Sequence, residues 1–203
     1  MRRVEIESGR AMLTSLLTPE CFGEGLAVVG DSIVQLLWRE NACLVHGLKE
    51  LEFRRALPLP NGMREGWGLT TDDAGKLYAS DGTDTLHVLD ARTLEVLRRI
   101  KVRSTGGPLG SRPVSNLNDL QWVRGEIWAN LWYEDRLAVI DPESGNVRGY
   151  INLEALLSPK ERRSLRSQEE CLNGIAYDAD ADELYVTGKC WPKVRAHLSL
   201  IHI

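Results

Sequence analysis

The feature that most constrains the fold is a hairpin-like segment that recurs along the chain. Four segments have a polar or Gly-containing start, an apolar strand, a turn and a second apolar strand: "GEGLAVVGDSIVQLLW", "EGWGLTTDDAGKLYASD", "NLNDLQWVRGEIWANLW" and "CLNGIAYDADADELYVTGK". Three others share a second pattern with an acidic turn: "RRVEIESGRAMLTSLL", "LHVLDARTLEVLRRIKV" and "LAVIDPESGNVRGYINL". Strict alternation and Gly/Asp turns predict β-hairpins rather than a helical repeat.

The spacing of these segments predicts a β-propeller. Their equivalent starts, at Gly25, Gly68, Asp119 and Gly174, are 43, 51 and 55 residues apart. Units of four short strands at a period of about 40–45 residues are typical of propeller blades. Two loops, 102–115 and 153–170, account for the extra length, and "SPKERRSL" in the second predicts a short helix with Ser158 as its N-cap.

We therefore expect an all-β chain, a single β-propeller domain over residues 1–203. Its parts are the end of a first blade (1–18), further blades (19–60, 61–104, 115–153 and 171–203) and a loop with a short helix (154–170). The chain opens in the second half of a blade, so the first half-blade is predicted to be missing.

Composition excludes several function classes. The net charge of -4 and pI near 5.6 argue against a nucleic-acid or anionic-membrane binder. The four histidines and four cysteines show no HxxH, HExxH or CxxC spacing, so no metal site is predicted. Free thiols are favoured, with a Cys171–Cys190 bridge as the alternative.

The repeats place polar and aromatic side chains at equivalent positions. Two residues before the first apolar residue of each opening strand stand Glu24, Trp67, Asn118 and Asn173. Fourteen residues later, or sixteen in the last hairpin, stand Trp38, Asp81, Trp132 and Lys189. Antiparallel pairing brings both positions to the same end of a hairpin. In a propeller these ends converge at one mouth of the central channel, where they would form a cup for a small amide- or peptide-like ligand.

Each of these residues also has a structural interpretation. Tryptophan packs between blades, and Asn or Asp at a strand end serves turns. We assign Asp81, which precedes Gly82, to a turn, and Trp122, Trp128 and Trp191, which lie off the shared register, to packing. The combination of Glu24 and Lys189 at one strand-rich mouth is the unusual feature.

The motifs resemble those of the glutaminyl cyclases of plant and bacterial type. The resemblance covers roughly residues 2–193 and depends on "FGEGL", "LLWRE", "EGWGLTTDDAGKLYASDGTDTLHVLD", "NLNDLQW", "IWANLWYEDRLAVIDPESG" and "LNGIAYDADADELYVTGKCWPK". It implies a five-bladed β-propeller that converts an amino-terminal glutamine to pyroglutamate with release of ammonia, without a metal or other cofactor. The family's earlier F-T-Q-G-L motif has no counterpart here, which implies a chain truncated at its amino terminus.

The resemblance also implies which residues form the site. It matches the acidic residue to Glu24, the asparagine to Asn118 and the lysine to Lys189, all three in the catalytic group. The substrate-binding aromatic residues are matched to Phe22, Trp38, Trp67 and Trp132. The implied partner is a peptide or protein with amino-terminal glutamine. The implied protein is a monomer that is secreted, periplasmic or in the secretory pathway.

We expect Glu24 to carry protons between the attacking amine and the leaving ammonia, with its pKa raised by apolar surroundings. Lys189 has two open roles, as an oxyanion stabiliser or as a partner that keeps Glu24 ionised. Two other function classes stay open: a non-catalytic peptide-binding propeller or inactive fragment, and a calcium-dependent lactonase-like propeller. Three tryptophans and a lysine make a hard-cation site less attractive.

Overall fold

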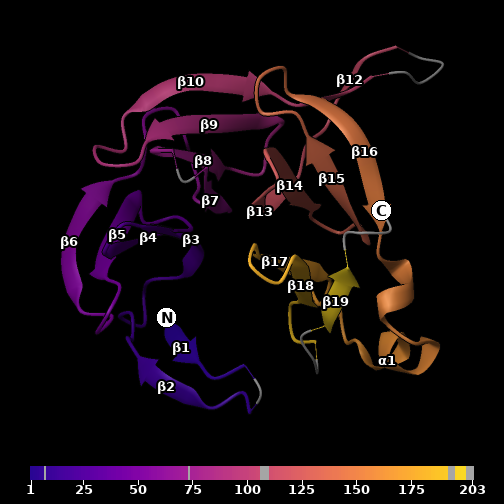
Figure 1. Cartoon of the computed structure of the whole chain (residues 1–203), viewed down its shortest axis with the longest axis horizontal. Helices are drawn as coiled ribbons and strands as arrows, with labels where there is room; N and C mark the ends of the chain where they lie inside the picture. Colours follow the sequence, from indigo (N-terminus) through magenta and orange to yellow (C-terminus); the bar gives the residue numbers. More distant parts are fainter. Residues whose placement is uncertain (7, 73, 106–109, 192–194, 200–203) are drawn as a thin grey trace. The chain divides into compact units, whose positions relative to one another are not determined.

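Strands make up nearly all of the regular structure in the computed structural model, which describes residues 1–6, 8–72, 74–105 and 110–191 and the backbone of 195–199. The prediction of an all-β chain is confirmed (Figure 1). The chain divides into two units. Unit 1 comprises Met1–Asp81 and His87–Arg98, and unit 2 comprises Gly82–Leu86 and Arg99–Ile203.

Unit 1 contains the first hairpins of the chain. Its strands are β1 (Arg2–Val4), β2 (Ala11–Thr14), β3 (Gly23–Val29), β4 (Ser32–Leu37), β5 (Ala42–Gly47), β6 (Phe53–Pro58), β7 (Leu69–Thr71) and β8 (Lys76–Ser80). β1 pairs with β2, and β3 to β6 form an antiparallel sheet in chain order. β7 and β8 continue into β9 (Thr85–Asp90) and β10 (Val96–Lys101), two strands that cross the boundary between the units.

Unit 2 contains the later hairpins. Its strands are β11 (Arg103–Ser104), β12 (Arg112–Pro113), β13 (Leu117–Val123), β14 (Glu126–Leu131), β15 (Arg136–Ile140), β16 (Asn146–Asn152), β17 (Leu172–Asp178), β18 (Glu183–Gly188) and β19 (Arg195–Ser199). One sheet has the order β12-β11-β16-β15-β14-β13 and the other β17-β18-β19. The segment predicted as a plain loop, 102–115, thus contributes two short strands, because β11 pairs in parallel with β16.

The predicted helix is present. The 3-10 helix η1 (Glu154–Leu156) precedes α1 (Pro159–Ser164). Ser158 caps α1: its hydroxyl accepts the Glu161 backbone N–H, and the Glu161 carboxylate accepts the Ser158 N–H. This reciprocal capping box and Pro159 at the first position explain why so short a segment is helical.

Aspartates form the tight turns that separate the paired strands. Asp90 Oδ1 accepts the backbone N–H groups two and three residues further along, each at 2.9 Å, and Asp141 Oδ1 does the same. Asp178 repeats the arrangement at 2.9 and 3.0 Å. Where the chain reverses direction, an aspartate oxygen of this kind takes the place of a backbone carbonyl as the acceptor of backbone N–H groups. The acidic turns predicted for the segments of the second repeat pattern are confirmed at Asp90 and Asp141.

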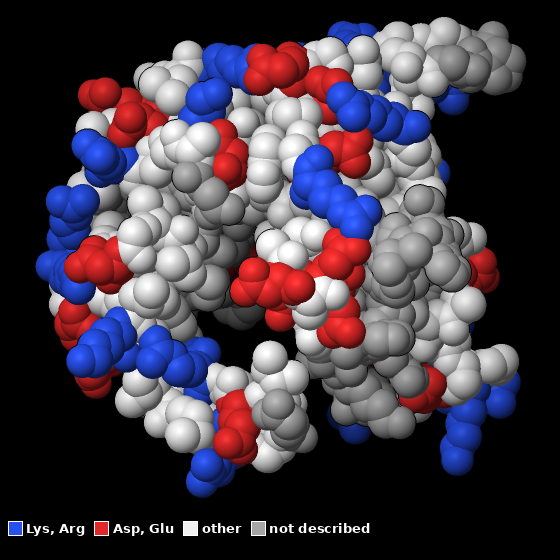
Figure 2. Space-filling model, in the orientation of Figure 1, with Lys and Arg blue, Asp and Glu red and all other residues white. Residues whose placement is uncertain are grey.

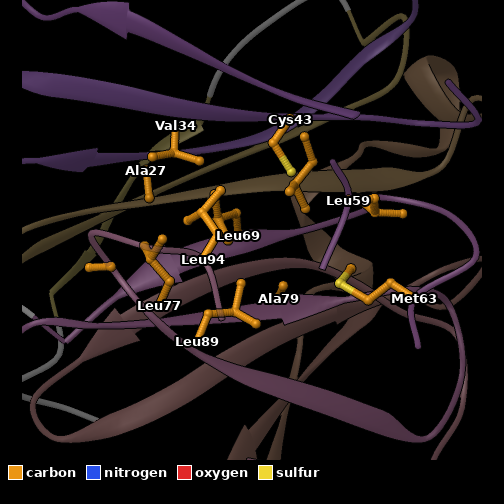
Figure 3. Packing of buried hydrophobic residues seen from close by; sticks show 12 residues of the cluster. Ala27, Val34, Cys43, Leu59, Met63, Leu69, Leu77, Ala79, Leu89 and Leu94 are labelled. Carbon is orange, nitrogen blue, oxygen red and sulfur yellow. The ribbon is translucent and has the colours of Figure 1, made fainter. Parts of the chain in front are cut away.

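The apolar faces of neighbouring sheets form a core within each unit. In unit 1, Leu36, Cys43, Leu69, Leu77 and Leu89 belong to one buried cluster (Figure 3). In unit 2, Trp128 packs with residues from β13 to β18. The alternation that predicts each strand therefore also selects the side chains that hold adjacent sheets together.

Gly25 lies where β3 meets β7. Its N–H donates to the Trp67 carbonyl at 2.6 Å. A Cβ on Gly25 would lie 2.5 Å from both the Leu69 nitrogen and the Trp67 oxygen, which are backbone atoms. Only a residue without a side chain permits this approach.

We expect Gly25→Ala to destabilise the fold by about 1–3 kcal/mol, because a methyl group pressed against backbone cannot be relieved by a rotamer change. Urea unfolding would measure the loss. Gly149→Ala is the matched control, since nothing lies within 4 Å of a Cβ there. Equal midpoints for the two variants would contradict this account of the β3–β7 contact.

The surface carries charges of both signs. On the face shown in Figure 2, Lys and Arg side chains are interspersed with Asp and Glu. Arg54 contacts Asp31 and Glu52 at 3.0 Å each, and Arg148 contacts Glu126 and Asp141. Exposed pairs of this kind contribute little to stability. Among the described residues, no helix has the length and apolar character that crossing a membrane requires.

Candidate functional site

Three hairpins share a β-bulge at the end where the site residues were predicted. In β3–β4 the pairing passes from Gly23 with Leu37 to Leu26 with Gln35, so β3 contains one extra residue. The register shifts in the same way after Leu117 in β13 and after Leu172 in β17. Bulges bend a strand and redirect its side chains, and they are common beside active sites.

The predicted residues lie at these bulges. Glu24, Asn118 and Asn173 each directly follow the first paired residue of the opening strand. Their counterparts across the hairpin, which directly follow the last paired residue of the second strand, are Trp38, Trp132 and Lys189. The prediction that each pair shares one end of its hairpin is confirmed.

The β7–β8 hairpin places its two residues at the equivalent end. Trp67 precedes β7, and its N–H donates to the Ser80 carbonyl at 3.1 Å, which places Asp81 beside it. The Asp81 carboxylate lies 3.0 Å from Nε2 of His87, and both side chains are buried. Asp81, predicted as a turn residue, therefore also forms a buried carboxylate–imidazole pair, which the sequence interpretation missed.

Unit 1 gathers the carboxylate and two of the predicted tryptophans. Glu24 is half-buried and adjoins Gly25, which bonds to the Trp67 carbonyl. Phe22 and Trp38 meet edge to face with ring centroids 6.0 Å apart, and the Trp38 N–H donates to the Phe22 carbonyl at 3.0 Å. Phe22 is 56% exposed, so it forms an open edge of this group.

A second carboxylate in unit 1, Glu65, was missed. Its Oε2 accepts the indole N–H groups of Trp38 at 2.8 Å and Trp67 at 2.9 Å. Burial raises the pKa of Glu65, but hydrogen bonds from Trp67, Trp38 and Arg39 outweigh it, so the pKa is lowered overall. Glu65 stands two residues before Trp67 in "EGWGL", and this closeness in the sequence is the signal that could have identified it as a site residue.

Unit 2 gathers the amide, the third tryptophan and the lysine. Asn118 is 4% exposed. Lys189 Nζ lies 5.7 Å from the centre of the Trp132 ring, within cation–π range. Trp132 also stacks on Tyr133 with centroids 4.2 Å apart. The lysine thus adjoins an aromatic face, and its backbone N–H is held by the Cys171 carbonyl at 2.9 Å.

Two side chains of the β13–β14 hairpin hold the bulge of β17. Asp119 Oδ2 accepts the Ile175 N–H at 2.8 Å, and Asn130 Oδ1 accepts the Gly174 N–H at 2.9 Å. Burial raises the pKa of Asp119 to about 6, against the opposing hydrogen bonds from Ile175 and Leu120. Asp119, which the sequence indicated only as a repeat position, therefore fixes the strand that carries Asn173.

The raised pKa of Asp119 has a consequence for stability. Between about pH 4 and pH 6 the folded chain holds more protons than the unfolded chain, so the free energy of unfolding falls as the pH rises through that window. At pH 7.5, Asp119→Asn should therefore be as stable as the parent or up to about 1–3 kcal/mol more stable, because its amide oxygen still accepts the Ile175 N–H.

Urea unfolding at pH 4.5 and pH 7.5 would measure this difference. Asp119→Ala is the matched control, and it should be less stable at both values because Ile175 loses its acceptor. An Asn variant that loses stability relative to the parent as the pH rises would contradict the assignment.

The remaining sequence predictions concern packing, thiols and metals. Trp128 is 6% exposed in the core, as predicted, and Trp191 packs against the same cluster while its Nε1 donates to the Glu170 carbonyl at 3.1 Å. The four cysteines are free thiols, so the alternative Cys171–Cys190 bridge is not formed. Within the described part of the chain, no three His, Cys, Asp or Glu side chains are arranged to hold a metal ion.

Comparison with known proteins identifies the family. The glutamine cyclotransferase family model matches residues 1–196, a range that contains every predicted site residue. The chain belongs to the glutamine cyclotransferase family. The resemblance to plant and bacterial glutaminyl cyclases is thereby confirmed.

Individual members of the glutamine cyclotransferase family extend the comparison. Glutaminyl-peptide cyclotransferase of Arabidopsis thaliana is 37% identical over 197 residues, an alignment that includes 96% of this chain and 58% of the relative. The chain thus spans a little over half the length of that relative. The crystal structure of Myxococcus xanthus glutaminyl cyclase is 29% identical with a TM-score of 0.83, covering 96% of this chain and 81% of the other.

A more distant likeness concerns the fold alone. The WD40 β-propeller domain of Doa1 is 13% identical with a TM-score of 0.54, over 93% of this chain and 54% of the other.

Proposed function

We propose that the protein is a glutaminyl-peptide cyclotransferase, which converts the amino-terminal glutamine of a peptide or protein to pyroglutamate and releases ammonia. The observation that carries the proposal is the family match over residues 1–196, which includes the acid, the amide, the lysine and the aromatic residues in their expected order. The named activity of the Arabidopsis relative supports it.

We also propose the five-bladed β-propeller as the fold. The recurring hairpins, the second hairpins with acidic turns and the likeness to the Myxococcus enzyme support this architecture. In it, β3, β7, β13 and β17 are equivalent strands of successive blades. Their bulged or open ends then present the site residues at one mouth of the channel.

The reaction fixes what the site must do. The α-amine attacks the γ-carbonyl carbon of the same residue, a C–N bond forms, and the bond from that carbon to the side-chain nitrogen breaks. The amine, with a pKa of about 7.7–8.0, must lose a proton, and the leaving nitrogen must gain one to depart as ammonia. One group that accepts the first proton and returns it to the leaving nitrogen balances the reaction.

Glu24 is the residue to which we assign this proton transfer. It lies in the bulge of β3, is half-buried, and adjoins the segment that carries Trp67. Glu65, the nearby alternative carboxylate, is occupied by Trp38, Trp67 and Arg39, and its pKa is lowered, so it is the poorer base. A general base works best when its pKa lies near the operating pH.

The other residues have binding and electrostatic roles. Phe22, Trp38, Trp67 and Trp132 would exclude water and hold the glutamine side chain in the cyclic near-attack shape. Asn118 would hydrogen-bond an amide or carbonyl of the substrate. Lys189 would either stabilise the developing oxyanion or keep Glu24 ionised.

Three further features belong to the proposal. The enzyme needs no metal, since the proton transfers above are complete without one. It acts as a monomer. It is secreted, periplasmic or in the secretory pathway, which fits a substrate class of processed peptides with free amino termini.

A direct assay tests the function. Purified protein is incubated with a Gln-initiated peptide, with and without EDTA, while ammonia release and pyroglutamate formation are followed together. Equal amounts of both products, unaffected by the chelator, would support a metal-independent cyclotransferase. A folded protein that binds the peptide without releasing ammonia would contradict catalysis and favour a peptide-binding propeller. Loss of activity with EDTA would favour the calcium-dependent class.

A further inference from the structure

The Glu65 carboxylate collects three donors from two hairpins. Oε2 accepts from the indole nitrogens of Trp38 and Trp67, and Oε1 accepts from Nε of Arg39 at 3.0 Å. Trp38 ends the β3–β4 hairpin and Trp67 begins the β7–β8 hairpin. One side chain therefore fixes the relative orientation of two indoles that lie 29 positions apart in the chain.

Only a carboxylate satisfies this arrangement. Both indole N–H groups and the guanidinium are donors with no acceptor capacity, and an ionised carboxylate is acceptor-only at both oxygens. A glutamine would have to turn its own NH2 group toward one of the donors. Bonds to an ionised acceptor are also stronger than those between neutral groups, so they hold the indole rings firmly.

A close backbone contact at Gly66 holds Glu65 in this position. The Gly66 N–H donates to the Trp38 carbonyl at 3.0 Å. A Cβ on Gly66 would lie 2.6 Å from the Leu37 carbonyl oxygen and 2.8 Å from the Leu36 Cβ. Only glycine allows the Glu65 segment to lie this close to the end of β4.

Neither of the two tryptophans is fully buried. Trp38 and Trp67 are both half-buried, and the N–H edge of each indole is bonded to Glu65. The Arg39 guanidinium lies 3.7 Å from the centre of the Trp38 ring and covers one face. With one face covered and the N–H edge bonded, the orientation of Trp38 is fixed before any ligand arrives.

We propose that Glu65 is a positioning residue that sets the orientation of Trp38 and Trp67 for binding the amino-terminal residue of the substrate. The inference rests on the proposed function and deepens it. In this role Glu65 acts through the two indoles and not on the reacting atoms. Its removal should therefore weaken substrate binding and leave the chemical step nearly unchanged, whereas a merely structural contact would change stability alone.

The experiment uses Glu65→Ala, with Glu65→Gln as the conservative variant. Glu52→Ala is the matched control. Glu52 is also paired with an arginine at 3.0 Å, but among the described residues it bonds no indole. Indole 1H–15N resonances, assigned with Trp38→Phe and Trp67→Phe, report the hydrogen bonds without reference to activity. A Gln-initiated peptide is then titrated against each variant in a Glu24→Gln background, where turnover is expected to be about 10²–10⁴-fold slower, and steady-state kinetics are measured with Glu24 intact.

The expected result has three parts. In Glu65→Ala the Trp38 and Trp67 indole resonances move upfield together, the peptide Kd and the KM rise about tenfold, and kcat changes less than threefold. Glu65→Gln lies between Ala and the parent, and Glu52→Ala matches the parent. An unchanged Kd and KM in a folded Glu65→Ala variant would overturn the proposal, as would a loss confined to kcat. Lack of turnover in the parent would instead overturn the proposed function, while the resonances and the Kd would still decide the role of Glu65.

Discussion

Glu24→Gln should lower kcat by about 10²–10⁴-fold while peptide binding stays within a few-fold of the parent, because the amide keeps the size of the carboxylate but cannot accept and return the proton. The side chain is half-buried at the bulge of β3, where Gly25 and Trp67 hold the backbone. The substitution therefore removes proton transfer without removing the geometry.

Single-turnover and steady-state assays of ammonia release would measure the loss, and peptide titration would measure binding. Glu50→Gln, an exposed glutamate in the turn before β6, is the control for an equivalent change of charge in unit 1. Turnover near the parent level in a folded Glu24→Gln variant would show that another group carries the proton. The assignment to Glu24 would then be wrong.

The hairpins could be predicted because their determinants are local. Alternating side chains select the strands, and an aspartate or Gly-containing turn reverses the chain within a few residues. The position of Trp38 relative to Glu24 followed from the same logic, since a fixed separation along a hairpin fixes which residues meet at its end. The capping box of α1 was likewise readable over four residues, from Ser158 to Glu161.

The contacts that unite different hairpins could not be predicted in this way. Glu65 bonds an indole 27 residues earlier, and Asp119 bonds a backbone N–H 56 residues later. No periodicity encodes such partners, because they depend on which sheets become neighbours. The bulges are similar: the sequence spacing placed Glu24, Asn118 and Asn173 at equivalent positions, but only the pairing of the strands reveals the extra residue that redirects them.

The short pairing of β11 with β16 was missed for a related reason. Residues 102–115 contain glycines, prolines and serines, which favour a loop. The Arg103 N–H nevertheless donates to the Gly145 carbonyl at 2.9 Å, and Val114 pairs with Val102 at 3.0 Å. A neighbouring strand edge supplies the partners, so tertiary context overrides local composition here.

At neutral pH, Lys189→Met should lower kcat by about 10²–10³-fold, because it removes the cation assigned to the oxyanion or to Glu24 and keeps an unbranched apolar side chain against Trp132. Lys160→Met, at an exposed position in α1, is the control for loss of a lysine. A Lys189→Met variant with parental turnover would remove the lysine from the mechanism.

The pH profile of Lys189→Met separates its two roles. If the lysine keeps Glu24 ionised, its removal raises the pKa of the catalytic carboxyl, and the acidic limb of kcat/KM moves to higher pH while the plateau is partly retained. If the lysine stabilises the oxyanion, the whole profile falls and the acidic limb stays in place. The two mechanisms thus differ in which part of the curve moves. Lys189→Arg sharpens the comparison, because a charge alone is enough to hold Glu24 ionised, whereas an oxyanion donor must also have the right geometry.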